Sequence, residues 1–279
     1  MRIGIVGAGA MGSGIALAFA QAGECEVVLA DMKKDIAETG ARRIKAKLDT
    51  LAAKGKMDAQ TAAAIFGRIV PAEKNGLAEC DLVIEAVLER MDVKKALFAE
   101  LQTICGKDAV FATNTSSLSI TEIGHGLDRP LVGMHFFNPA DMMKLVEVIA
   151  GVNTPPELVE KVKKIAESIG KTPVEVKEAG GFVVNRILVP MINEAVGILS
   201  EGVASVEDID TAMCLGANHP MGPLALGDLI GLDVCLAIME VLHAEMGEDK
   251  YRPHPLLRKM VRGGLLGRKT KKGFYEYPS

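Results

Sequence analysis

The hydrophobic and polar positions of the first thirty residues predict a strand, a helix and a second strand. The run RIGIVGAG is short and apolar, as expected of a buried strand, and AMGSGIALAFAQAG continues as a helix rich in small residues. CEVVLAD then predicts a second buried strand that ends on an acidic residue. The chain therefore opens with one βαβ unit.

The same alternation of strands and helices continues to residue 182. Amphipathic patterns predict a helix over about 32–54 and a shorter one at AQTAAAIFGR, which Asp58 precedes as a candidate cap. Further strand-like runs are CDLVIEAV, DAVFATNT, PLVGMHFFN, KLVEVIA and KTPVEVKE, and further helical runs are VKKALFAELQTI and PPELVEKVKKIAESIG. This order predicts an α/β domain with a largely parallel, doubly wound, Rossmann-like sheet.

Beyond Phe182 the pattern is helical only. The helical runs cover about 183–201, 206–215, 223–246 and 255–262. We therefore predict two domains, a Rossmann-like α/β domain over 1–182 and an all-helical domain over 183–279, with a kink at Pro190. The apolar positions of LALGDLIGLDVCLAIMEVL exceed one amphipathic stripe, which favours a homodimer contact through the second domain.

Composition narrows the classes of partner and compartment. The net charge is −4, with 32 basic and 36 acidic residues spread along the chain, which argues against nucleic acid. Glycines and polar residues interrupt every long apolar run, so we expect no membrane span. The five cysteines are widely spaced and form neither a CxxC pair nor a Cys/His cluster. We expect a soluble cytoplasmic protein without a metal site.

The glycines after the first strand fit a dinucleotide-binding turn. Gly7, Gly9 and Gly12 match GxGxxG between a strand and a helix, the context that the motif requires. The first glycine permits the tight turn, the second lets the backbone approach a pyrophosphate, and the third lets the helix lie close to the sheet. The helix N-terminus then offers N–H groups to the phosphates. Met11 lies within the motif, and we expect it to contact the cofactor.

An acidic residue at the end of the second strand points to NAD. Asp31 lies 19 residues after Gly12, where a carboxylate accepts hydrogen bonds from the adenosine ribose. Its charge would repel the 2′-phosphate of NADP. Lys33 and Lys34 follow at once and could partly neutralise that repulsion, so NADP stays open as a secondary cofactor.

One histidine suits proton transfer. His135 ends an apolar strand, and the carboxyl ends of strands in such folds face the ligand crevice, whereas His125 lies in a polar loop where we expect exposure. Oxidation of a secondary alcohol needs a base, and imidazole has a suitable pKa. Glu147 lies in the following strand-like run, so its carboxylate would meet the imidazole if the two strands pair.

Two further polar features have both a ligand and a structural interpretation. The cluster TNTSSLSIT follows a buried strand, where it would contact a substrate or form a turn and a helix cap. Asn185 lies in an apolar helix, where it would contact a ligand or form a hydrogen bond in the core.

Six segments together resemble the 3-hydroxyacyl-CoA dehydrogenases, and within that family the bacterial 3-hydroxybutyryl-CoA dehydrogenases. They are IGIVGAGAMGSGIA, TNTSSLSITEI, MHFFNPADMMKLVEV, GFVVNRILVPMINEA, NHPMGPLALGDLIGLDV and GRKTKKGFYEY. The resemblance implies a Rossmann-like domain followed by a helical dimerising domain. It also implies reversible hydride transfer between NAD and carbon 3 of a short (S)-3-hydroxyacyl-CoA, with 3-hydroxybutyryl-CoA and acetoacetyl-CoA as the expected pair.

The resemblance also implies roles for residues in catalysis and substrate binding. His135 matches the general acid/base and Glu147 the carboxylate that orients it. Ser116 and Asn185 match the residues that hold the substrate's oxygen atoms.

The remaining matched residues belong to the cofactor and CoA sites. Glu89, Lys94 and Asn138 match cofactor contacts, and Ser116 is counted with them. Lys54 matches a lysine that contacts CoA, as suits a cation facing phosphates, and Thr50 stands where relatives can have a second lysine.

Two other functions stay open. A dehydrogenase of free β-hydroxy acids would share both domains, but such enzymes usually have a lysine at the catalytic position, which GMHFFNP does not provide. A non-catalytic NAD-binding protein would share the scaffold, and the intact polar residues Ser116, His135, Glu147 and Asn185 argue against it.

Overall fold

The computed structural model describes residues 1–278, and its first part is built on one eight-stranded sheet. The strands are β1 (Arg2–Val6), β2 (Glu26–Asp31), β3 (Ile69–Glu73), β4 (Leu82–Glu85), β5 (Val110–Thr113), β6 (Leu131–Phe136), β7 (Leu145–Ala150) and β8 (Thr172–Lys177). They lie in the order β3-β2-β1-β4-β5-β6-β7-β8, and only β6 and β7 pair antiparallel. This sheet confirms the predicted α/β class.

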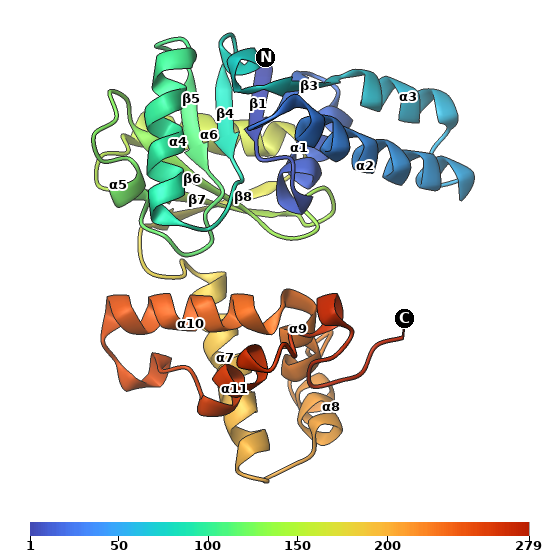
Figure 1. Cartoon of the computed structure of the whole chain (residues 1–279), viewed down its shortest axis with the longest axis vertical. Coiled ribbons are helices and arrows are strands. Elements are labelled where there is room, and N and C mark those ends of the chain that lie inside the picture. Colours follow the sequence, from blue (N-terminus) through green and yellow to red (C-terminus); the bar gives the residue numbers. More distant parts are fainter. Residues whose placement is uncertain (279) are drawn as a thin grey trace. The chain divides into compact units, whose positions relative to one another are not determined.

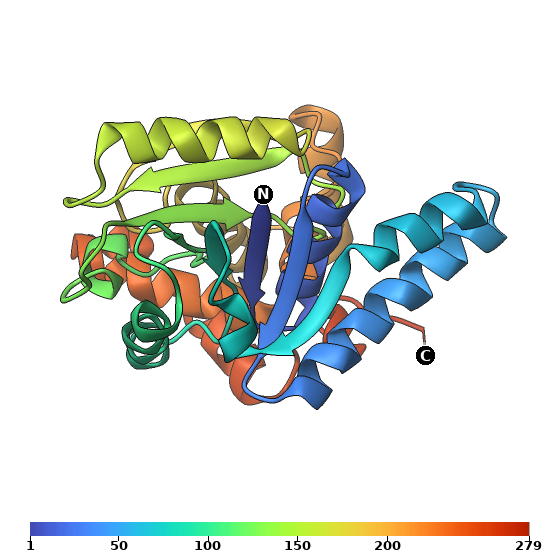
Figure 2. The same cartoon turned by 90° about the horizontal axis from the view of Figure 1, so that it is seen from above.

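Helices cover both faces of this sheet. They are α1 (Ala10–Ala22), α2 (Lys34–Ala53), α3 (Ala59–Gly67), the short η1 (Lys74–Leu77), α4 (Met91–Ile104), α5 (Ile120–Ile123) and α6 (Pro156–Ser168). Helices α2 and α3 form a hairpin that extends beyond the β3 edge of the sheet (Figures 1 and 2). Asp58 caps α3 as predicted, since its carboxylate accepts the Thr61 N–H at 2.7 Å.

Alternating side chains of the central strands divide the core between the two faces. Helices α1 and α6 cover one face, where the rings of Phe19 and Phe136 lie 6.5 Å apart. Helix α4 covers the other face, where Phe98 packs on Phe111 of β5 at 5.5 Å. Successive residues of a strand point to opposite faces, so residues two positions from Phe111 lie on the same face as Phe111.

The sequence patterns did not predict strand β3, and they left a helix cap open as one interpretation of TNTSSLSIT. Strand β3 is a half-buried edge strand that contains Pro71, and it pairs with β2 alone. Proline removes one backbone donor and is tolerated at an edge, so neither a continuous apolar run nor a clean alternation marks this strand. Helix α5 is a single short turn, capped by Ser119, whose hydroxyl accepts the Glu122 N–H at 3.0 Å.

The second part of the chain is helical. Its helices are α7 (Val184–Ser200), α8 (Val206–Gly216), α9 (Pro223–Ile230), α10 (Leu232–Met246), η2 (Asp249–Tyr251), α11 (Pro255–Arg262) and η3 (Arg268–Thr270). The single run expected over 223–246 is wrong, because Gly231 adopts a φ of 105° and separates α9 from α10. Helix α7 continues through Pro190, and the kink at that residue stays a prediction.

Two buried carboxylates organise the helical part. Asp210 accepts the N–H groups of Leu224 and Ala225 at the start of α9, at 2.8 and 2.9 Å. Asp228 accepts those of Phe274 and Tyr275, both at 3.0 Å. These bonds attach α9 to α8 and the C-terminal segment to α9, so both acids have a structural role.

The chain forms two compact units, Met1–Glu178 and the residues from Ala179 onward. Both this division and the predicted boundary after residue 182 fall in the connection between β8 and α7. None of the helices described for residues 1–278 combines the length and apolar character that a membrane span needs.

Candidate active site

The glycine turn between β1 and α1 has the geometry that a dinucleotide requires. Gly7 has a φ of 104°, and a Cβ there would lie 2.5 Å from the Ala86 carbonyl oxygen. A Cβ at Gly12 would lie 1.8 Å from the carbonyl oxygen of Gly7, whereas one at Gly9 would meet nothing within 4 Å. Gly7 and Gly12 are therefore required by packing, and Gly9 leaves open space at the start of α1 for a phosphate.

Asp31 supports this turn from the end of β2. One carboxylate oxygen accepts the Ala8 N–H at 2.7 Å, and the other accepts the Met32 N–H at 2.7 Å. Each oxygen has a further lone pair for a ribose hydroxyl, so the residues present fit a bound dinucleotide. The side chains of Lys33 and Lys34 are exposed, and the use of NADP stays a prediction.

His135 and Glu147 form a buried pair on adjacent strands. They are direct partners in the antiparallel register of β6 and β7, and Nδ1 lies 2.8 Å from Oε2. The two residues are 4% and 1% exposed. Because a carboxylate accepts hydrogen bonds, the pair fixes the imidazole proton on Nδ1 and leaves Nε2 as the basic nitrogen. The predicted contact between these residues is thus present.

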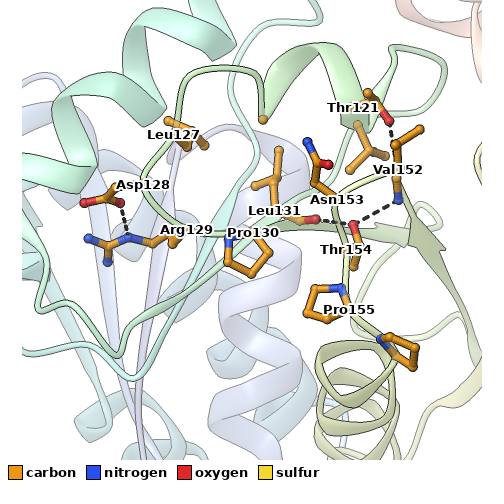
Figure 3. Close-up of a pocket in the computed structure, with 14 residues that line it drawn as sticks. Thr121, Leu127, Asp128, Arg129, Pro130, Leu131, Val152, Asn153, Thr154 and Pro155 are labelled. Carbon is orange, nitrogen blue, oxygen red and sulfur yellow. Dashed lines mark hydrogen bonds and ion pairs between the residues drawn. The ribbon is translucent and has the colours of Figure 1, made fainter.

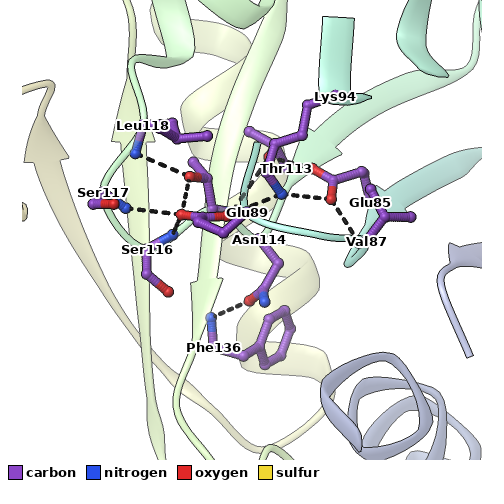
Figure 4. A network of polar contacts seen from close by, with 11 residues as sticks. Glu85, Val87, Glu89, Lys94, Thr113, Asn114, Ser116, Ser117, Leu118 and Phe136 are labelled. Atoms are coloured by element: carbon purple, nitrogen blue, oxygen red, sulfur yellow. Dashed lines mark hydrogen bonds and ion pairs between the residues drawn. The ribbon is translucent and has the colours of Figure 1, made fainter. Parts of the chain in front are cut away.

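Glu89 holds the segment that follows β5. Its Oε1 atom accepts the N–H groups of Ser116 and Ser117 at 2.7 and 3.2 Å and the hydroxyl of Thr115 at 2.6 Å (Figure 4). Its Oε2 atom lies 3.1 Å from the ammonium group of Lys94. The predicted residues Glu89, Lys94 and Ser116 therefore share one network, in which Lys94 is 1% exposed.

The loop after β6 carries Asn138, and the side chain of Lys171 holds this loop. Asn138 is exposed and precedes Pro139 through a cis peptide bond. The buried ammonium group of Lys171 donates to the carbonyl oxygens of Ala140 and Met143 at 2.7 and 2.8 Å, and burial lowers the Lys171 pKa. Asn138 thus lies on a constrained loop at the same edge as His135.

Three further predicted residues belong to other elements. Lys54 caps the C-terminal end of α2 and is exposed. Met11 lies in the first turn of α1 and packs partly against the core. Asn185 lies on α7 of the second compact unit. Their roles remain predictions, whereas His125 is exposed as predicted.

Sequence reasoning missed two charged residues that support the site, Glu85 and Lys171. Glu85 and Thr113 are wholly buried at the ends of β4 and β5, and Asn114 accepts the Phe136 N–H at 2.8 Å. Thr113 and Asn114 belong to the cluster TNTSSLSIT, for which a ligand and a structural interpretation both stayed open. A charged residue inside an apolar strand, as in CDLVIEAV, is a signal that could have found Glu85, because burying such a group is costly without a partner.

A separate hollow of about 620 Å³ lies near the start of β6 (Figure 3). Leu131 and Thr154 line it, and Thr154 donates its hydroxyl to the Leu131 carbonyl at 2.5 Å. Because His135 lies near the opposite end of β6, this hollow is distinct from the candidate active site. Within residues 1–278, no three His, Cys, Asp or Glu side chains are grouped as ligands for a metal ion.

Comparison with known proteins identifies the family. Residues 2–179 match the family described as 3-hydroxyacyl-CoA dehydrogenase, NAD binding domain, and residues 181–277 match 3-hydroxyacyl-CoA dehydrogenase, C-terminal domain. The chain belongs to the 3-hydroxyacyl-CoA dehydrogenase family. This confirms the predicted family, its class of enzyme and NAD as its cofactor.

Individual relatives agree over their full length. The chain is 53% identical to a 3-hydroxybutyryl-CoA dehydrogenase of Clostridioides difficile, over 99% of both chains. It is 47% identical to one of Bradyrhizobium diazoefficiens, over 99% of this chain and 95% of the other. The crystal structure of (S)-3-hydroxybutyryl-CoA dehydrogenase from Ralstonia eutropha matches with a TM-score of 0.94 and 46% identity, covering 100% of this chain and 99% of that one.

Proposed function

We propose that this dehydrogenase interconverts short-chain (S)-3-hydroxyacyl-CoA and 3-ketoacyl-CoA with NAD(H), and that 3-hydroxybutyryl-CoA and acetoacetyl-CoA are its preferred pair. The observation that carries the proposal is the buried contact of 2.8 Å between His135 and Glu147, at the end of β6. The names of the relatives at about half identity support the four-carbon substrate.

In this proposal His135 handles the proton. NAD, which the glycine turn and Asp31 would hold, would supply the hydride acceptor for carbon 3 in oxidation and, as NADH, the hydride donor in reduction. His135 Nε2 takes the hydroxyl proton in one direction and gives it back in the other. The carboxylate of Glu147 keeps the Nδ1 proton in place and stabilises the imidazolium that forms.

The remaining roles divide between substrate and cofactor. Ser116 and Asn185 would hold the oxygen at carbon 3 and the thioester oxygen, and Lys54 would face the CoA phosphates. Glu89 and Asn138 would contact the nicotinamide half of the cofactor. Asp31 and the glycine turn would hold the adenosine and the pyrophosphate.

We also propose the domain division 1–182 and 183–279, with the helical domain serving in substrate binding and forming a homodimer. Large apolar side chains are exposed on that domain. They include Ile187 at 69%, Val203 at 70% and Leu215 at 83%. A contact between two copies would remove such surface from water.

Initial rates test the proposed reaction. NADH and NADPH are each offered with acetoacetyl-CoA, with longer 3-ketoacyl-CoAs and with free acetoacetate. We expect NADH oxidation that depends on the CoA ester and a higher kcat/KM for NADH than for NADPH. Comparable rates with free acetoacetate would favour the free-acid enzyme. NADH binding without oxidation would favour a non-catalytic protein.

A further inference from the structure

Glu85 is a charged residue at the end of a buried strand, and all its contacts lie inside the protein. It is 0% exposed. Its Oε1 atom lies 2.6 Å from the Lys94 ammonium and accepts the Val87 N–H at 2.7 Å, and its Oε2 atom accepts the Thr113 hydroxyl at 2.6 Å (Figure 4). Both oxygens are therefore occupied by protein donors.

Lys94 connects this buried acid to a second one near the surface. Its ammonium lies between Glu85 at 2.6 Å and Glu89 at 3.1 Å. The Glu89 side chain is 39% exposed. Lys94 therefore links a carboxylate in the core, Glu85, to a carboxylate at the edge of the site, Glu89. A buried ion pair gains little stability over a well-packed apolar pair, so stability alone does not account for two charges at this position.

Glu89 in turn fixes the segment that contains Ser116. Its other oxygen accepts the N–H groups of Ser116 and Ser117 and the hydroxyl of Thr115. Loss of charge at Glu85 would leave the Lys94 ammonium with Glu89 as its one carboxylate partner in this network. The ammonium would then draw the Glu89 carboxylate away from the Ser116 N–H.

This network lies on the same face of the sheet as the proton-transfer pair. Glu85 and Thr113 are register partners on β4 and β5, Thr113 pairs with Gly133 on β6, and His135 pairs with Glu147 on β7. Alternation along each strand points these polar side chains to the face that α4 and α5 cover. Glu85 lies two strands away from His135 in the sheet, and His135 lies two residues further along β6 than Gly133.

The sheet order places the same network beside the cofactor crevice. Strand β1 leads to β2 and β3 on one side, and β4 follows on the other, so the strand order reverses between β1 and β4. Dinucleotides cross such a sheet at this point, and the half remote from Asp31 extends over β4 and β5.

We propose that Glu85 is a positioning residue for the reaction: through Lys94 and Glu89, it holds the backbone of Ser116 in place to contact substrate and cofactor. The proposal rests on the proposed function for its kinetic consequence. Its structural consequence, order in the segment 115–117, can be measured without any substrate.

The test combines amide hydrogen exchange with kinetics on the Glu85→Gln variant. Gln keeps the size of the side chain and removes its charge. We expect exchange to rise about tenfold or more in the peptide 114–119, with the peptides of β1 and α1 unchanged. We expect kcat/KM for acetoacetyl-CoA to fall about 10²-fold, since displacement of a substrate-positioning group by about 1 Å has that effect.

Asp228→Asn is the matched control, because it also neutralises a buried acid that accepts backbone N–H groups. We expect it to lower the melting temperature without changing exchange in 114–119. If Glu85→Gln does not fold, Thr113→Val replaces it, because it removes one donor to Glu85. Thr113 Oγ1 also accepts the Thr115 N–H at 3.3 Å, so exchange is then read at the Ser116 and Ser117 N–H groups alone. We then expect the same local rise in exchange and a smaller loss of kcat/KM, about tenfold.

Wild-type exchange in 114–119 in the folded variant would overturn the proposal. An equal rise there in the Asp228→Asn control would do the same, because the effect would then be general loosening. Failure of the proposed function gives a different result. The wild-type enzyme would not oxidise NADH with acetoacetyl-CoA, while the local rise in exchange would persist.

Discussion

Substituting two glycines of the dinucleotide turn separates the effect of packing on stability from the effect on cofactor binding. Gly12→Ala tests packing, and Gly9→Ala tests the space for the cofactor. A Cβ at Gly12 would lie 1.8 Å from the Gly7 carbonyl oxygen, about 1.5 Å closer than an ordinary C···O contact of about 3.3 Å. The first turn of α1 must therefore move. An overlap this large belongs at the upper end of the cost of overpacking, about 3 kcal/mol or more, which lowers the melting temperature by at least about 6 °C.

Gly9→Ala is expected to change stability little and to weaken NADH binding. Nothing lies within 4 Å of the added Cβ, and the backbone there, with a φ of −70°, suits alanine. Loss of a glycine at the helix N-cap costs about 0.5–1 kcal/mol, so the melting temperature falls by less than about 4 °C. The methyl group occupies the space that the pyrophosphate needs, so we expect the Kd of NADH to rise at least about tenfold.

Differential scanning fluorimetry and NADH fluorescence titration measure the two effects separately. Gly12→Ala is expected to lose both stability and binding, and Gly9→Ala to lose binding alone. Wild-type stability in Gly12→Ala would refute the packing argument. Wild-type NADH affinity in Gly9→Ala would refute the assignment of the open space to the pyrophosphate.

Three further predictions follow from the site and the helical domain. Glu147→Gln should lower kcat about 10²–10⁴-fold with little change in KM, because the imidazolium loses its carboxylate; an unchanged kcat in steady-state assays would contradict this. Burial raises the pKa of Cys80 and of Cys235 to about 12, so both stay protonated at pH 8. Mass spectrometry after iodoacetamide treatment of the folded enzyme should find them unmodified, and rapid alkylation of either would show that it is accessible. Sedimentation equilibrium should give about twice the chain mass of 29.6 kDa, and a single-chain mass at micromolar concentration would rule out a stable homodimer.

Much of the first unit could be predicted because its strands are buried on both faces. Continuous apolar runs such as RIGIV and LVGMHF mark central strands without any knowledge of their neighbours. Strand β3 pairs with one strand only and contains Pro71, so its sequence shows neither a continuous apolar run nor a regular alternation of apolar and polar residues. Gly231 divides one apolar helical pattern into α9 and α10 through its φ of 105°, and a glycine inside such a pattern does not reveal its backbone conformation.

Part of the candidate site could also be predicted from the sequence, and part could not. The glycine turn and the pair His135 and Glu147 could be predicted because each depends on one strand and its neighbour in the chain. The contact between Glu85 and Lys94 depends on how α4 packs on β4, which spacing along the chain does not fix. Such contacts between elements need the fold before they can be recognised.

In the proposed reaction, His135 transfers the proton of a 3-hydroxyacyl-CoA. The most direct test compares the rate of NADH oxidation with acetoacetyl-CoA in the wild-type enzyme and in His135→Ala. Melting temperature and the Kd of NADH are measured for both proteins, to show that the variant is folded and binds NADH as the wild type does. We predict a loss of kcat of about 10²–10⁴-fold. A folded His135→Ala variant that binds NADH and keeps most of its turnover would contradict the claim.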